Sequence, residues 1–255
     1  MARIEHKYLV RLSQLDRLRK TLKPYLRLDN YAAQNSGKEY TVRSIYFDTK
    51  NLDFYHEKID GLRTRKKIRV RGYNHCLQDA TVFLEIKKKK GAFIKKHRSP
   101  VGYESLMPLL VTGDVESYIF STNGYTYATE NAERFLYQIR HLALRPYILI
   151  IYEREAYYSK FNHDLRITFD KNIRSQYHAS LNNLFDDDSG IPILPKHCVL
   201  EVKSVIQYPA WLSDILTQFN LKQQSVSKYA LCIDSHRGRK PKLNIISNGH
   251  FRLKK

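Results

Sequence analysis

The chain has 255 residues, 42% of them hydrophobic, so it can bury a sizeable core and does not have the composition of a disordered chain. Lysine and arginine number 44 against 25 acidic residues, and this formal net charge of +19 indicates an anionic partner: a nucleic acid, an anionic membrane or a small polyanion. The sequence contains no run of 18 apolar residues, so no transmembrane helix is predicted, and no signal-peptide core is recognisable. Its three cysteines lack metal-ligand spacing, which favours reduced thiols in a cytoplasmic protein.

The first part of the chain is predicted to consist of strands and one helix. Residues 3–10 have the pattern of a strand, and apolar residues at helical spacing predict a helix over 12–25, with Ser13 as its N-cap. β-Branched and aromatic residues then predict strands at 40–48, 66–73 and 81–89. Lys90 and Gly91 suit a turn, so 92–98 is predicted to return as a hairpin partner.

The second part alternates between helices and strands. Helices are predicted at 103–111, 130–142, 209–219 and 225–233, and strands at 147–157, 165–170 and 199–204. The residues after Asp234 are basic and include glycine and proline, which is typical of a loosely ordered tail. We therefore expect one folded domain over 1–234 and a basic C-terminal tail over 235–255.

Charged side chains occupy every second position of several predicted strands. Successive side chains of a strand point to opposite faces, so Lys67, Arg69 and Arg71 share one face, and Ile68 and Val70 the other. The same reading gives further polar faces: Glu5 and Lys7, Glu85 and Lys87, Tyr152 and Arg154, Arg166 and Asp170, and Glu201 and Lys203.

Two architectures fit this alternation. The first is an antiparallel sheet with one solvated face and one face on the core. In the second, the sheet closes on itself and the polar face lines a tunnel, which removes the sheet edges. Basic residues dominate the polar faces, and like charges on neighbouring strands repel unless an anion lies between them, which favours the tunnel.

Some carboxylates recur two residues before a lysine, namely Glu5, Glu85 and Glu201. A carboxylate among cations can bind a divalent metal that bridges phosphate oxygens, although it can also simply neutralise its neighbours. Asp170 is interpreted as a structural group or as a group in the outer shell of the metal, rather than as a direct metal ligand. No P-loop motif and no Ser-His-Asp arrangement is found.

Several ordered segments resemble a known family. EHKYLV, YTVRSIYFDT, LDFYHEKIDGLRTRKKIRVRGY, FLEIKKK, YEREAY, LRITFD, LEVKS and SKYALCI, spread from Glu5 to Asp234, are similar to the polyphosphate polymerase domain of the vacuolar transporter chaperone (VTC) family, bacterial type. That family belongs to the triphosphate tunnel metalloenzymes (CYTH-like superfamily). The resemblance implies an α+β fold: an antiparallel β-tunnel, closed as a barrel, with a basic interior and helices packed outside.

The resemblance also implies an activity, which is transfer of the terminal phosphate of ATP to a growing inorganic polyphosphate chain with Mn²⁺ or Mg²⁺. Glu201 is the implied metal ligand, with Glu5 as a second candidate. Catalytic roles are implied for Lys228, Glu201, Arg69 and Arg71. The implied phosphate-binding residues are Lys7, Arg69, Arg71, Lys87, Lys96, Tyr152, Arg154, Arg166, Lys203, Ser227 and Lys228, with Lys95 as the alternative to Lys96 because the hairpin register is open.

Other functions would use the same basic lining. In a tunnel-type triphosphatase, water replaces the phosphate acceptor. In a non-catalytic module that binds polyphosphate, inositol phosphate or pyrophosphate, Glu201 would be dispensable. Specific nucleic-acid binding is disfavoured, because the charges alternate along strands and no RNA- or DNA-binding signature is found. The basic tail is a candidate contact for an anionic membrane or a membrane-protein partner.

Overall fold

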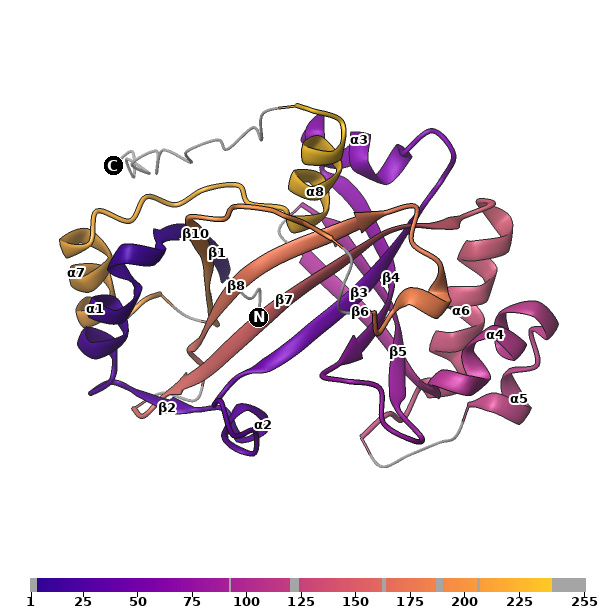
Figure 1. Ribbon diagram of the computed structural model, residues 1–255, viewed down its shortest axis with the longest axis horizontal. Helices are drawn as coiled ribbons and strands as arrows, with labels where there is room; N and C mark the ends of the chain where they lie inside the picture. The colour runs from indigo at the N-terminus through magenta and orange to yellow at the C-terminus, as the bar shows by residue number, and fades with distance from the viewer. Residues whose placement is uncertain are drawn as a thin grey trace, which may run out of the picture.

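A computed structural model gives the fold, and it describes residues 4–91, 93–119, 124–161, 164–186, 190–205 and 207–239. Most of the tail predicted over 235–255 lies outside the described residues. Antiparallel strands form one strongly twisted sheet (Figure 1). Its order is β1 (Ile4–Arg11), β10 (His197–Ser204), β8 (Arg166–Tyr177), β7 (Arg145–Ser159), β3 (Tyr40–Asp48), β4 (Thr64–Tyr73), β5 (Thr81–Lys90) and β6 (Phe93–Gly102). Two short strands extend it: β2 (Leu26–Leu28) pairs with β7, and β9 (Ile191–Pro192) pairs with β8.

The two ends of the strand order are β1 and β6, and their described residues form no pairing with each other. Side chains reach across instead, since Lys87 Nζ on β5 lies 3.2 Å from Glu5 Oε2 on β1. The predicted α+β fold with a large antiparallel sheet is therefore confirmed. Closure of the sheet into a hydrogen-bonded barrel is not seen among the described residues.

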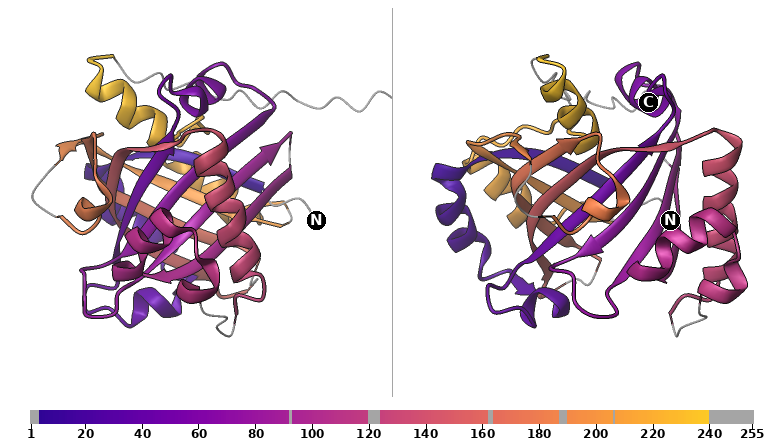
Figure 2. Two further views of the ribbon diagram at one scale, coloured as in Figure 1. Left: turned by 90° about the vertical axis from the view of Figure 1, so that its right-hand side faces the viewer. Right: turned by 45° about the vertical axis from the view of Figure 1, so that its right-hand side comes forward.

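One group of helices covers the outer face of β4, β5 and β6, as Figure 2 shows. Alternate residues of these strands, including Ile68, Val70, Leu84 and Ile86, are at most 1% exposed and pack in one cluster with Phe135 and its helical neighbours. The helices are α4 (Tyr103–Thr112), α5 (Val115–Tyr118) and α6 (Ala128–His141). The apolar half of the strand alternation thus buries the outer core and leaves the charged half facing inward.

A second pair of helices covers the outer face at the other end of the sheet, around β1, β8 and β10 (Figure 1). These are α1 (Leu12–Leu22) and α7 (Ala210–Gln218), which pack against Ile167, Leu200 and Val202. Ser13 does not cap α1 as predicted. The helix follows directly from β1, and Arg11 occupies the N-cap position without a side-chain hydrogen bond.

Helix α8 (Lys228–His236) corrects the prediction that the helices pack outside. It lies on the inner face, where the Tyr229 ring stacks on Tyr46 of β3 at a centroid distance of 5.1 Å and packs in one cluster with Ile150. Every residue from Lys228 to Asp234 is buried. A helix buried on all sides is not amphipathic, so it fills the interior of the coiled sheet rather than covering it.

Among the described residues four short helices were not predicted: α2 (Asn30–Ala33), α3 (Asp53–Ile59), α5 and the 3₁₀ turn η1 (Leu181–Asn183). Helix α3 begins where the carboxylate of Asp48 accepts hydrogen bonds from the backbone N–H groups of Phe54 (3.0 Å) and Tyr55 (3.1 Å). No helix in the described ranges combines the length and hydropathy needed to cross a membrane.

Candidate functional site

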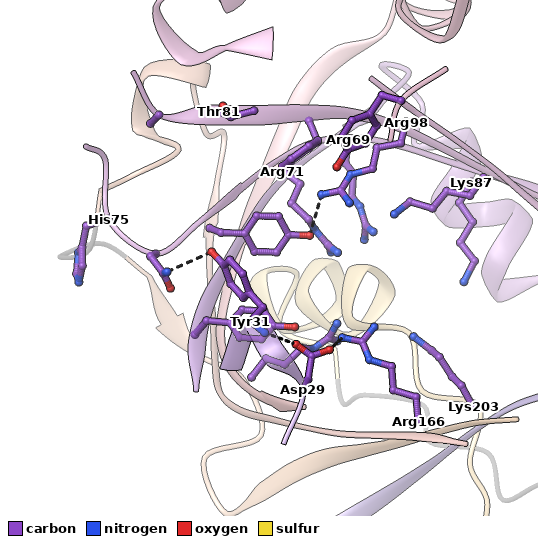
Figure 3. A pocket seen from close by; sticks show the side chains of 18 of the residues that line it. Asp29, Tyr31, Arg69, Arg71, His75, Thr81, Lys87, Arg98, Arg166 and Lys203 are labelled. Atoms are coloured by element: carbon purple, nitrogen blue, oxygen red, sulfur yellow. Dashed lines mark hydrogen bonds and ion pairs between the residues drawn. The ribbon is translucent and has the colours of Figure 1, made fainter. Parts of the chain in front are cut away.

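Inward-facing side chains of the sheet surround a cavity of about 880 Å³ (Figure 3). The four arginines predicted to converge, Arg69, Arg71, Arg154 and Arg166, all line it, although they come from β4, β7 and β8. The cationic lining residues are Arg69, Arg71, Lys87, Lys96, Arg98, Arg154, Arg166 and Lys203. Strand alternation is the reason, because each of these side chains lies on the face opposite the outer core.

Glu85 organises the part of the wall formed by β4, β5 and β6. Its carboxylate is 1% exposed, accepts a hydrogen bond from Arg69 Nε at 2.7 Å, and lies 2.6 Å from Lys96 Nζ and 3.3 Å from Arg98 Nε. Burial by itself would raise the pKa of Glu85, but Arg69, Arg71 and Lys96 hold it well below the usual value. The carboxylate is therefore ionised and fixes several cations at the cavity wall.

The hairpin register places Lys96, rather than Lys95, on the cavity side. Lys96 is opposite Lys87 in the β5–β6 pairing and lines the cavity with it. Lys95 is opposite Lys88, so its side chain belongs to the other face of the sheet. Arg98, two residues beyond Lys96, also lines the cavity and was not among the predicted site residues. The same alternation rule could have found it.

The N-terminus of α8 brings Lys228 into the site. Ser227 caps the helix by accepting a hydrogen bond from Ala230 N–H, and its hydroxyl also accepts one from Lys67 Nζ at 3.1 Å. Lys228 Nζ donates to Glu201 Oε1 at 2.9 Å, contacts the Asp170 carboxylate and lies 4.8 Å from the centre of the Tyr152 ring. Burial would lower the pKa of Lys228, but Asp170 and Glu201 raise it above the usual value, so the ammonium group stays charged.

Asp170 contacts two cations of the site directly. Arg154 Nε and Nη2 donate to its two oxygens at 2.6 and 2.7 Å, and the carboxylate is fully buried. Burial would raise the pKa of Asp170, and Arg154 and Lys228 lower it. The contacts fit the interpretation of Asp170 as a structural group, because they fix Arg154 and Lys228 relative to each other.

Glu201 lies in a ring of cations. Lys7 Nζ on β1 is 3.2 Å from Glu201 Oε1, and Lys203 Nζ is 3.3 Å from Oε2. Burial would raise the pKa of Glu201, but Lys228, Lys7 and Lys203 hold it well below the usual value. For Lys203 burial prevails over the attraction of Glu201 and Glu5, and its pKa is lowered to about 8.

The site fits a divalent metal only if phosphate supplies part of the coordination. Within the described ranges no three His, Cys, Asp or Glu side chains gather as a metal site. However, Lys7 Nζ lies 3.4 Å from Glu5 and 3.2 Å from Glu201, so two carboxylates stand on either side of one ammonium group. Mg²⁺ is commonly bound by one or two carboxylates together with water and substrate phosphates. The donor set fits a metal that binds with its substrate.

The predicted site residues form two layers. Glu5, Arg69, Arg71, Lys87, Lys96, Arg154, Arg166 and Lys203 line the cavity. The remaining predicted residues lie behind this lining. Lys7 contacts Glu5, Glu201 contacts Lys203, and Tyr152 accepts a 3.4 Å hydrogen bond from Arg71. Ser227 and Lys228 stand at the start of α8.

Positive charge exceeds negative charge among the described residues in and behind the cavity wall. Eleven cations (Lys7, Lys67, Arg69, Arg71, Lys87, Lys96, Arg98, Arg154, Arg166, Lys203 and Lys228) surround five carboxylates (Glu5, Asp29, Glu85, Asp170 and Glu201). Lys67 shows the result, since burial and repulsion by Lys7 and Lys87 lower its pKa well below the usual value. An anion with several charges would relieve this repulsion.

Comparisons with known proteins agree with this architecture. The VTC domain family matches residues 2–236. A putative adenylate cyclase from Bacillus halodurans has 15% sequence identity to this chain and a TM-score of 0.50, over 89% of this chain and 96% of that one. A putative adenylyl cyclase from Hippeastrum, described as having a dominant triphosphatase activity, has 12% identity and a TM-score of 0.49, over 96% and 100%. No curated protein matches the chain. The likeness to the Bacillus halodurans protein supports the fold alone.

Proposed function

The chain belongs to the VTC domain family, and from that premise we propose that it transfers the terminal phosphate of ATP to inorganic polyphosphate inside a basic tunnel. The observation that carries the proposal is the convergence of eight cationic side chains from several strands on one cavity, beside the buried carboxylate of Glu201. Phosphoryl transfer depends mainly on positioning and on neutralising the charge of the transferred group, and this cavity supplies both.

Arginine is suited to gripping the phosphate chain. A guanidinium group offers planar, paired donors for two phosphate oxygens, whereas an ammonium group acts as a point charge. Arg71 is already oriented in the described structure, because its Nε donates to Ser44 Oγ at 3.0 Å and its Nη2 to Tyr152 at 3.4 Å. A side chain fixed in this way loses little conformational entropy when phosphate binds.

The length of the cavity favours a polymeric acceptor. It extends along β5 from Thr81 to Lys87, which corresponds to roughly 20 Å of strand. Leu77, 75% exposed, borders it beyond the Thr81 end, and Ile94, 41% exposed, borders it near the hairpin. The space can therefore hold an extended triphosphate and the end of a second phosphate chain, with solvent-exposed residues at both ends. Simple hydrolysis of a triphosphate would not require the space for a second phosphate chain.

The roles of the remaining groups follow from their positions. A divalent metal held by Glu201, with Glu5 and phosphate oxygens as further ligands, would stabilise the charge that develops on the leaving phosphates. Lys228 supplies a fixed positive charge at the N-terminus of α8, where the helix dipole also favours an anion. A phosphate oxygen of the acceptor attacks the terminal phosphorus of ATP directly, the bond from this phosphorus to the bridging oxygen breaks and ADP leaves, so no nucleophilic side chain is required.

The test is to incubate the full chain with ATP and Mn²⁺, to resolve polyphosphate on a gel and to measure ADP and orthophosphate. Long chains with a matching amount of ADP are expected. Orthophosphate without chains would replace the proposal by a triphosphatase. ATP that remains intact although inorganic tripolyphosphate binds would replace it by a binding module. A preparation of Arg69→Met serves as the control for a contaminating enzyme, because Arg69 is part of the cavity wall.

A further inference from the structure

Aromatic side chains line one part of the cavity. They are Tyr31, Tyr40, Tyr73, Phe83 and Tyr125, and they come from α2, β3, β4, β5 and the segment before α6. Figure 3 shows Tyr31 and His75 at one end of the cavity and Lys87 and Lys203 at the other. The wall therefore changes along its length from aromatic to cationic.

The rings form a continuous set. The centroid distances are 5.9 Å from Tyr31 to Tyr73, 5.9 Å from Tyr73 to Phe83 and 5.9 Å from Phe83 to Tyr125. Tyr40 joins the set through Tyr31, at 4.8 Å. Tyr31 is still 42% exposed, so this set is not a sealed part of the core. Its rings border open space in which another flat ring could lie.

Arg98 adds a flat cationic group to the same surface. Its guanidinium carbon lies 3.5 Å from the centre of the Phe83 ring and 5.8 Å from those of Tyr73 and Tyr125. Arg98 is also held by Glu85, the carboxylate that fixes Arg69 and Lys96. Nucleobases stack on both aromatic rings and guanidinium planes.

The arrangement matches one class of ligand. An inorganic phosphate chain has no flat group that can stack on these rings, whereas a nucleoside polyphosphate carries a flat base at one end and phosphates at the other. We propose that the aromatic end, defined by Tyr31, Tyr73, Phe83, Arg98 and Tyr125, is a nucleobase site. The nucleotide lies with its base against these residues and its phosphates toward the cationic end. This inference rests on the proposed function, since it assigns a place to the nucleotide donor of that reaction.

Asp29 connects the aromatic end of the cavity with its cationic end. Its carboxylate accepts a hydrogen bond from the backbone N–H of Tyr31 at 2.9 Å, which caps α2, and another from Arg166 Nη2 at 3.1 Å. Arg166 lines the phosphate end of the same cavity. Asp29 is therefore a positioning residue that fixes the base-stacking Tyr31 relative to a phosphate-binding arginine.

The base is held by stacking rather than by reading its edge. Asn74 also lines the cavity, and its amide groups are occupied: Oδ1 accepts from Thr41 N–H at 3.1 Å, and Nδ2 donates to the Tyr31 hydroxyl at 3.3 Å and to Asn35 Oδ1 at 3.2 Å. Stacking tolerates any base, because every base has a π-face. Non-hydrolysable analogues of ATP and GTP are therefore expected to bind within about threefold of each other.

The experiment compares two probes on the full chain by calorimetry: a non-hydrolysable β,γ-imido analogue of ATP and inorganic tripolyphosphate, both with Mn²⁺. Tyr31→Ala and Tyr125→Ala are expected to weaken binding of the ATP analogue by about tenfold each, and binding of tripolyphosphate by less than about twofold. Tyr31→Phe keeps the ring and should bind the analogue almost as the unchanged protein does. Tyr137→Ala is the matched control, because Tyr137 is 59% exposed on α6 and does not line this cavity.

The outcomes separate this inference from the proposed function. If tripolyphosphate binds and the Tyr→Ala changes leave the affinity for the ATP analogue intact, the nucleobase site is refuted and the basic site stands. Equal losses for both probes would also refute it, because they would indicate a structural role for the rings. If the unchanged protein binds neither probe, the proposed function itself fails.

Discussion

Arg154 on β7 and Asp170 on β8 face each other across adjacent strands and form two parallel hydrogen bonds of 2.6 and 2.7 Å beneath the cavity wall. Such a pair is costly to bury and costly to break, because either partner alone would leave an unpaired charge out of water. The pair therefore holds the guanidinium group of Arg154 in one orientation at the cavity wall.

Replacing Asp170 by Asn is expected to destabilise the protein by about 3–5 kcal/mol, because Arg154 loses the partner of its two short hydrogen bonds and Lys228 loses one of its two buried anions. Urea unfolding measures the change. Adding tripolyphosphate should restore part of the loss, since it supplies negative charge to the same cations. Asp16→Asn is the control: its side chain is 85% exposed and its pair with Arg19 is worth roughly 1 kcal/mol or less. Equal stability losses in the two variants would contradict the role given to Asp170.

Replacing Glu201 by Gln is expected to separate binding from turnover. The change keeps the shape and removes the negative charge that faces Lys7, Lys203 and Lys228, so tripolyphosphate should bind at least as tightly as before. If Glu201 holds the metal as proposed, metal-dependent turnover should fall by about 10²-fold or more. Turnover that keeps its rate and its Mn²⁺ dependence would remove Glu201 from the catalytic assignment. Glu116→Gln, on the exposed surface of α5, is the matched control.

Arg71→Lys keeps the charge and removes the planar fork that Ser44 and Tyr152 orient. The affinity for tripolyphosphate is expected to fall by about tenfold, because paired hydrogen bonds to phosphate oxygens are replaced by one point charge. The dependence of binding on salt concentration should stay the same for Arg71→Lys and weaken for Arg71→Met, since only the second change removes a charge. Calorimetry at several salt concentrations distinguishes them. A lysine variant with full affinity would show that charge alone matters at this position.

Binding of tripolyphosphate should weaken as the pH rises from 7 to 9. Burial lowers the pKa of Lys203 to about 8, so its side chain is a charged ammonium group below this pH and loses its proton and its charge above it. Lys203→Arg keeps its charge throughout this range and should flatten the decline. Titration of the ligand affects both proteins equally, so the difference between their pH profiles reports on Lys203. Identical profiles would show that another group, such as Lys67, causes the decline.

Strand alternation alone predicts much of this site. Arg69 and Arg71, Arg154, and Arg166 lie on strands whose apolar residues are equally regular, so their inward direction follows from the pattern. Arg98 follows the same rule. The aromatic end could not be predicted in this way, since Tyr31 lies on a four-residue helix and depends on a cap from Asp29 that is itself held by Arg166.

Tertiary contacts explain the other differences from the sequence-based expectations. Helix α3 starts after Leu52, which has a φ of 61°, and its free N–H groups are satisfied by Asp48 on the preceding strand, several residues away. Local propensity carries no sign of such a partner. Helix α8 was predicted as an element, but its place inside the sheet depends on Tyr46 and Ile150, which are remote in the chain.

The two ends of the sheet, β1 and β6, are not joined by backbone pairing among the described residues. The Lys87–Glu5 contact that reaches across joins side chains that are 38% and 18% exposed. Among the described residues the two ends of the sheet are thus joined here by partly solvated side chains and not by backbone hydrogen bonds, so added salt is expected to loosen this seam more than any pair of neighbouring strands.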